Sequence, residues 1–210
     1  MLWLGCATQF QPRTEIPPAV ETGKRLAFLG FKAALPPGHP PDVFRNPVSG
    51  SLYTAEPVPL EATEILNTML IDRLAAIGDE IITPEESSAV LSSIMARDSR
   101  AELTAVEIYR ETGRAMDVDG VLVGYLYRWQ EREGSNFAVE RAASAAFDLN
   151  LIRTSDSALI WRGKFDRTQK SLSENLLDFA GFLKRGGRWL KVEDFAASGL
   201  DGLLKNYPDL

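Results

Sequence analysis

The chain has few side chains of the kinds that perform acid–base or metal chemistry. Its only histidine, His39, lies between Gly38 and Pro40, whereas Ser-His-Asp and Cys-His catalysis need a histidine placed to exchange protons near neutral pH. A zinc site needs about three or four His, Cys or carboxylate ligands, and one histidine and one cysteine in separate irregular segments do not supply them. We therefore expect His39 to be a loop residue, and we predict no metal site and no cofactor.

Paired carboxylates are the second chemistry to consider, because glycoside hydrolysis uses two carboxyl groups held roughly 5 to 10 Å apart. The pairs nearest in sequence are Asp117 with Asp119 and Glu131 with Glu133. Charged strand ends and solvated faces explain both pairs better than catalysis does. The sequence also lacks the glycine-rich loops that cradle nucleotide phosphates. We predict that the protein is not an enzyme, with a carboxylate-dependent cell-wall hydrolase as the alternative.

Cys6 is the only cysteine, and it follows Gly5 and a short apolar stretch. This is the arrangement in which bacterial lipoproteins present the cysteine that receives lipid. A secretory signal, however, needs a basic segment and roughly 7 to 15 apolar residues, and only residues 1–4 precede Gly5. Two interpretations stay open: a start codon upstream of Met1 with a lipidated Cys6, or an ordinary cysteine near the terminus.

Residues 7–23 contain prolines among polar residues and show no helical or strand period. A proline-rich segment extends by about 3.1 Å per residue, so we predict a lipobox remnant and flexible tether over residues 1–23 and a single domain over 24–210. The net charge is −6 and the basic residues are dispersed, whereas nucleic-acid binding needs a basic patch, so we predict no nucleic-acid partner. No apolar run reaches the roughly 18 residues of a spanning helix, so we expect membrane attachment only through Cys6.

Hydrophobic periodicity predicts a mixed central sheet with helices packed on it. In the first half the expected elements are a buried strand at 24–31, a helix over about 62–77 ended by Gly78, a short strand at 80–84, and helices at about 85–95 and 100–116. In the second half they are an antiparallel three-strand meander between about 118 and 165, then two helices at about 172–183 and 192–205. In the middle strand, Asp148 and Asn150 mark one side as polar. The predicted fold class is α+β.

Two polar segments are candidates for contact with a partner. The first lies in a long proline-rich stretch, residues 34–59, because long irregular loops in compact domains are usually functional or disordered. The second joins the last long strand to a helix. The candidate partner-surface residues are Phe44, Arg45, Asn46, Tyr53, Asp166, Arg167 and Gln169. The alternatives are a surface loop held by Phe44 and Tyr53 packing inward, and a helix cap with its loop.

The order of these elements, together with particular residues, resembles the CsgG-like, TolB N-terminal-like family of bacterial envelope lipoproteins. The residues that carry the resemblance are Lys24–Phe31, Leu70–Leu74, Glu80–Glu85 and Val118–Gly124. The resemblance covers most of the chain. It implies a periplasmic domain, anchored by lipid to the outer membrane, that acts in secretion, envelope assembly or transport. It further implies contact with an envelope protein partner or self-association.

A subunit of a CsgG-type secretion pore is a further alternative. Such a pore needs membrane-crossing strands of about 9 to 11 residues with an apolar lipid-facing side. Only the meander between residues 121 and 165 has strands of that length, and the core already needs them. We therefore favour a non-catalytic interaction or assembly module.

Overall fold

In the computed structural model, the described residues are 25–98, 102–134, 139–168 and 191–208. At their centre is a five-stranded mixed sheet with the strand order β4-β1-β5-β8-β9. Its strands are β1 (Arg25–Ala33), β4 (Glu80–Ile82), β5 (Gly120–Gln130), β8 (Ser144–Arg153) and β9 (Leu159–Thr168). β1 runs parallel to both β4 and β5, and β5, β8 and β9 form an antiparallel meander. This arrangement confirms the predicted α+β fold.

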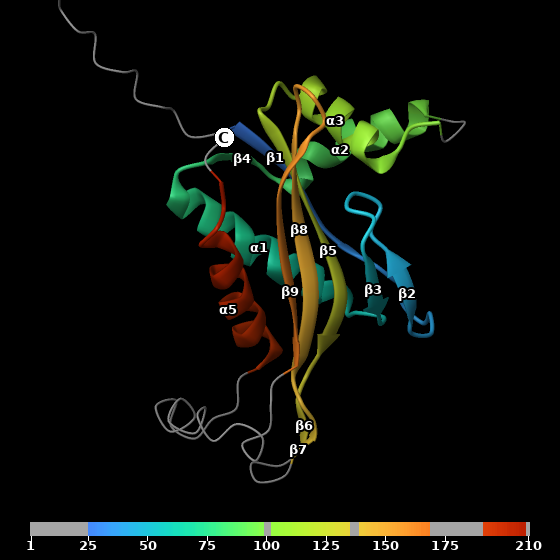
Figure 1. Cartoon of the computed structure of the whole chain (residues 1–210), viewed down its shortest axis with the longest axis vertical. Coiled ribbons are helices and arrows are strands. Elements are labelled where there is room, and N and C mark those ends of the chain that lie inside the picture. Colours follow the sequence, from blue (N-terminus) through green and yellow to red (C-terminus); the bar gives the residue numbers. More distant parts are fainter. Residues whose placement is uncertain (1–24, 99–101, 135–138, 169–190, 209–210) are drawn as a thin grey trace, which may run out of the picture.

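Both faces of the sheet are covered. The described helices are α1 (Leu60–Ile77), α2 (Pro84–Arg97), α3 (Ala105–Ala115) and α5 (Val192–Leu204). Figure 1 shows α1 and α5 on one face of the sheet, and α2 and α3 on the other. A separate two-stranded hairpin, β2 (Asp42–Arg45) and β3 (Leu52–Ala55), lies on the α2 and α3 side. The sheet is therefore the middle layer of the domain.

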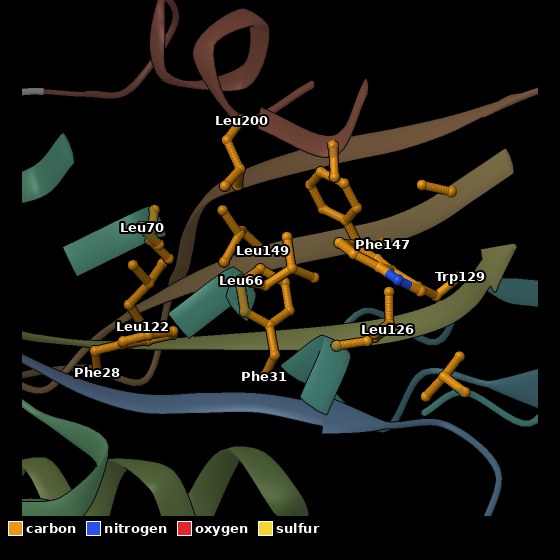
Figure 2. Packing of buried hydrophobic residues seen from close by; sticks show 14 of the residues in the cluster. Phe28, Phe31, Leu66, Leu70, Leu122, Leu126, Trp129, Phe147, Leu149 and Leu200 are labelled. Carbon is orange, nitrogen blue, oxygen red and sulfur yellow. The ribbon is translucent and has the colours of Figure 1, made fainter. Parts of the chain in front are cut away.

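The main core lies between the sheet and helices α1 and α5. Leu66, Leu70 and Leu74 follow one another at intervals of four residues, and all three are fully buried. Such spacing places side chains on one face of a helix, so the predicted apolar stripe of α1 is confirmed. Phe147 and Leu149 of β8 belong to the same cluster, and Figure 2 shows them facing the side chains of α1, β1 and β5.

Helix ends follow local signals in the sequence. Gly78 adopts the left-handed conformation with φ of 103°, so it ends α1 as predicted, since glycine reaches this conformation without a Cβ penalty. Thr83 and Thr104 begin α2 and α3 as capping boxes, each paired with a glutamate three residues later. Because Thr104 is the cap, α3 begins later than the predicted helix at 100–116. The predicted helix at 172–183 lies outside the described residues.

The stretch 34–59 is not the irregular loop that its prolines suggest, because it contains the β2–β3 hairpin. Each of its strands has only four residues, too few for the alternation of apolar and polar residues to stand out. A smaller hairpin of β6 (Glu133–Gly134) and β7 (Val139–Arg141) flanks the turn predicted near residue 134.

One side of β8 is polar, as predicted, and the fold buries it. Asp148 and Asn150 are both fully buried, on the face that carries the hairpin. Their register partners on β5 are Tyr125 and Val123, which are buried as well. Buried polar groups need hydrogen-bond partners, so this face is the first place to look for a specialised site.

Candidate functional site

The inner face of the β2–β3 hairpin packs against the sheet through aromatic rings. Phe44 and Tyr53 lie directly opposite each other, and both rings contact tyrosines of β5. The ring of Tyr53 stacks on that of Tyr127 with a centroid separation of 3.8 Å and an interplanar angle of 11°. The ring of Phe44 lies 5.9 Å from the ring centroids of both Tyr125 and Tyr127. The interpretation in which Phe44 and Tyr53 pack inward therefore describes this segment correctly.

Asn46 ties the turn of the hairpin to the sheet, and its side chain is fully buried. Its Oδ1 accepts hydrogen bonds from the backbone amides of Val48 at 2.8 Å and Ser49 at 2.9 Å, the local bonding that favours asparagine in turns. Its Nδ2 donates to the Tyr127 hydroxyl at 2.8 Å and to both carboxylate oxygens of Asp148 at 3.1 Å. One side chain thus shapes the turn and fastens it to β5 and β8.

Asp148 is the centre of this network, and no part of it is exposed to solvent. Its Oδ2 accepts from the Tyr53 hydroxyl at 2.9 Å, and its Oδ1 accepts from Nδ2 of Asn150 at 3.1 Å. Arg162 of β9 lies at the rim, with Nε 3.7 Å from Oδ2 of Asp148. The guanidinium also donates to the Ser51 hydroxyl at 2.7 Å and to the Tyr53 hydroxyl. Side chains of β5, β8 and β9 thus converge on one hairpin.

We call the network of side chains around Asp148 the hairpin clamp, and it consists of Asn46, Tyr53, Tyr127, Asp148, Asn150 and Arg162. Burial determines the direction in which the pKa values of its acidic groups shift. Removal from water raises the pKa of the Asp148 carboxyl above its usual value, although hydrogen bonds from Tyr53 and Tyr127 and the charge of Arg162 act to lower it. Burial and the neighbouring carboxylate raise the pKa of Tyr53 to about 12. The Tyr53 hydroxyl therefore remains a neutral hydrogen-bond donor near neutral pH.

The outer face of the hairpin consists of Val43, Arg45, Leu52 and Thr54, and it is exposed. Val43 and Leu52 have 62% and 58% of their surface accessible. Val43 is opposite Thr54 and Leu52 is opposite Arg45, so the two apolar side chains are diagonal neighbours on the same face. This face is a small apolar surface, bordered by a cation and held in place from below by the hairpin clamp.

The structure places the predicted partner-surface residues of the hairpin in exposed, buried and half-buried positions. Arg45 is exposed, as a contact residue must be. Asn46 and Tyr53 are buried, so the expectation that they face a partner is corrected: their polar atoms are used by the hairpin clamp. Phe44 is half-buried against the tyrosines of β5. Cys6 lies outside the described residues.

The second predicted contact segment, at the end of β9, does not form one surface either. Successive side chains of a strand point to opposite faces. Asp166 accepts a hydrogen bond from Nη2 of Arg128 at 2.7 Å. Arg167 instead borders a cavity of about 500 Å³ between β9 and α5, which Phe165 and Phe195 also line. The structure therefore does not bring Asp166 and Arg167 together on one face. Gln169 lies outside the described residues.

Two of the carboxylates considered for catalysis, Asp119 and Glu131, have structural contacts. Oδ2 of Asp119 accepts from the backbone amide of Arg25 at 2.9 Å, and Oε2 of Glu131 accepts from the amide of Val192 at 3.5 Å, at the start of α5. His39 is exposed in its loop. Within the described ranges, no group of three or more His, Cys, Asp or Glu side chains is arranged to hold a metal ion. Among the helices of those ranges, none is long and apolar enough to cross a membrane.

Sequence reasoning missed the clamp residues Tyr127 and Arg162 and the role of Asp148. One signal was available, since Asp148 and Asn150 interrupt an otherwise apolar strand and must find partners if buried. Those partners are distant in sequence: Tyr53 is 95 positions from Asp148, and Asn46 is 102 positions away. Only the register of the folded sheet brings them together.

No protein-family model matches this sequence, and no curated protein matches it either. Among solved structures, the PelC dodecamer from Paraburkholderia phytofirmans is 18% identical, with 89% of each chain covered and a TM-score of 0.44. The LpoB C-terminal domain from Salmonella enterica is 18% identical over 72% of this chain and 87% of that one, with a TM-score of 0.39. A lipoprotein from Neisseria meningitidis is 9% identical over 79% of this chain and 99% of that one, with a TM-score of 0.42.

Similarity at these identities and TM-scores concerns the general fold alone, and it supports no conclusion about activity or partners. Assignment to the CsgG-like, TolB N-terminal-like family stays a prediction from the sequence. The candidate functional site therefore depends on the geometry of the hairpin and its clamp.

Proposed function

We propose that the protein is a non-catalytic interaction or assembly module of the bacterial envelope, and that it contacts its partner through the outer face of the β2–β3 hairpin. The observation that carries this proposal is the hairpin clamp. An isolated two-stranded hairpin is only marginally stable in water, and here a buried polar network holds one in place with Val43 and Leu52 exposed. Interfaces combine an apolar centre with a polar rim. The proposed partner is an envelope protein or a second copy of this chain.

Capture from crosslinked cells tests this function. We would compare the full chain with the double variant Val43→Ser, Leu52→Ser, which makes the outer face polar without touching the clamp. Leu60→Ser is the matched control, because Leu60 is 69% exposed on α1. The partner should be recovered with the wild-type chain and the control. Recovery should be about thirtyfold lower with the double variant, since two interface side chains that contribute about 1 kcal/mol each are lost. Unchanged recovery with the double variant would contradict the proposal.

We propose in addition that Cys6 carries lipid and places the module in the periplasm, at the outer membrane. The support is the Gly5-Cys6 arrangement and the proline-containing segment 7–23 that follows it, which suits a tether. The test is incorporation of labelled palmitate into the product of the natural gene, including the sequence upstream of Met1. The label should disappear in Cys6→Ser, whereas label that survives this substitution, or no label at all, would overturn the proposal.

A further inference from the structure

The hairpin is joined to the large sheet mainly by side chains. Its strands form their own two-stranded sheet, and the turn bonds internally, from the amide of Asn46 to the carbonyl of Ser51 at 2.8 Å. Where the chain leaves the hairpin, the amide of Glu56 donates to the carbonyl of Tyr127 at 2.7 Å. Apart from the Glu56 bond, packing of the hairpin on the large sheet therefore depends on the aromatic contacts and on the hydrogen bonds that converge on Asp148.

The groups that face Asp148 come from every element packed around it. They are Asn46 and Tyr53 from the hairpin, Tyr125 and Tyr127 from β5, Asn150 from β8, Arg162 and Lys164 from β9, and, further along the same row, Lys32 from β1. Most are neutral hydrogen-bonding groups. The three cations are Lys32, Lys164 and Arg162, and their geometry decides how well the charge of Asp148 is balanced.

None of these cations makes a hydrogen bond to the carboxylate among the contacts of the described residues. Nε of Arg162 is 3.7 Å from Oδ2 of Asp148 and has no hydrogen-bond partner, because the guanidinium is directed to Ser51 and Tyr53. Nζ of Lys164 lies over the Tyr53 ring, 4.7 Å from its centroid. A carboxylate that is fully removed from water and incompletely paired is costly in its ionised form.

We propose that the β2–β3 hairpin is a proton-coupled cover, which closes over the tyrosines of β5 more firmly when Asp148 is protonated and loosens when Asp148 is ionised. This inference deepens the proposed function, because it regulates the same hairpin. Opening would admit water to Asp148 and uncover Tyr125 and Tyr127, and tyrosines are side chains that interfaces favour. The outer face of the hairpin would then have a different position relative to the sheet in the closed and open states.

The sign of the pH dependence follows from linkage. Burial raises the pKa of Asp148 in the closed state, whereas in an open, hydrated state it would have the ordinary aspartate pKa of about 3.9. The closed state therefore binds the proton more tightly, and acid favours closure. The stabilisation of the closed state is fully present below about pH 3.9 and is lost as the pH rises through the raised pKa.

Nuclear magnetic resonance of the full chain without any partner tests this inference. The side-chain carboxyl carbon of Asp148 reports its titration directly. Amide protection factors, corrected for the intrinsic exchange rate at each pH, report opening at Glu56, whose amide donates to the carbonyl of Tyr127 in the large sheet. Asp148 should titrate above the ordinary aspartate range. Protection should fall by up to about tenfold per pH unit between about pH 3.9 and that titration midpoint, and then level off.

Two variants sharpen the test. Asp148→Asn should remove the pH dependence of hairpin protection. Asp156→Asn is the control and should preserve it, because Asp156 pairs with Arg153 in an exposed turn. If Asp148→Asn fails to fold, the wild-type titration still decides. Titration of Asp148 at or below the ordinary range, or hairpin protection that does not follow its midpoint, would overturn the inference. That result would leave the proposed partner contact intact, since no partner takes part in the measurement.

Discussion

At the scale of single residues, the buried carboxylate of Asp148 dictates which neighbours the hairpin can carry. It accepts hydrogen bonds from Asn46, Tyr53 and Asn150, so each of these positions must supply a donor. Asn46 must supply more, because its Oδ1 also accepts from two amides of the turn. Asparagine provides a donor and an acceptor in one short side chain, which explains why this residue type suits the position.

Replacing Asn46 with aspartate tests this requirement. Asn46→Asp keeps the acceptor for the turn but sets a second carboxylate against Asp148 in a buried site. Two adjacent carboxylates cannot both ionise readily, so we expect a loss of about 3 kcal/mol in the free energy of unfolding at pH 7, with recovery as the pH falls and the pair takes up a proton. Urea unfolding at a series of pH values measures both.

The control for this substitution is Asn206→Asp, since Asn206 is exposed after α5. It should change the unfolding free energy by no more than about 0.5 kcal/mol. If Asn46→Asp were as stable as the wild-type chain at pH 7, or lost stability on acidification, Asp148 would not be the buried acceptor described above.

At this scale the sequence could indicate part of the site and no more. It identified Phe44, Arg45, Asn46 and Tyr53 as special because they stand in a long proline-rich stretch. It could not tell that Asn46 and Tyr53 face inward, because their partner Asp148 lies about 100 positions away. Contact over such a separation depends on sheet register, which the pattern of a single strand does not contain.

At the scale of elements, α5 packs closely against β9 through glycine. A Cβ added at Gly199 would lie 2.8 Å from the ring atoms of Phe165, closer than real Cβ contacts allow. A Cβ added at Gly202, one turn further along the same helix, would meet nothing within 4 Å. The two glycines therefore have different roles, and only Gly199 sets how closely helix and strand approach.

A matched pair of substitutions separates these roles. Gly199→Ala should lower the free energy of unfolding by about 1 to 3 kcal/mol, because the added methyl overpacks the interface. Gly202→Ala should raise it by up to about 1 kcal/mol, because alanine is the better helix former. Urea unfolding midpoints of the two variants, measured side by side, provide the comparison. Equal effects of the two substitutions would contradict the close packing of α5 on β9.

Periodicity predicted the helices and long strands of the described ranges well, because their side chains repeat over several turns or positions. It failed for the β2–β3 hairpin, whose strands are only four residues long. It also could not predict the strand order, in which β1 lies between β4 and β5. That order depends on the packing of α1 and of α2 with α3 on opposite faces, which is a property of the whole domain.

At the scale of the whole molecule, the central sheet is buried on both sides. Along β5, every residue from Gly120 to Tyr127 is buried, and β8 is buried from Ser144 to Ile152. A membrane-crossing strand alternates between lipid and lumen, so these strands would have to leave both covering layers to line a pore. The arrangement disfavours a pore built from this meander and favours a domain that works through its surface.

The proposed function depends on the outer face of the β2–β3 hairpin being the contact surface. The most direct measurement places a photo-crosslinking amino acid at Val43 or, for comparison, at Ile77, which is 51% exposed at the far end of α1. After irradiation of intact cells, we expect a discrete adduct from position 43 and none from position 77, with the mass of the adduct distinguishing an envelope protein from a second copy of the chain. No adduct from position 43, or equal yields from both positions, would contradict the proposed contact through the hairpin.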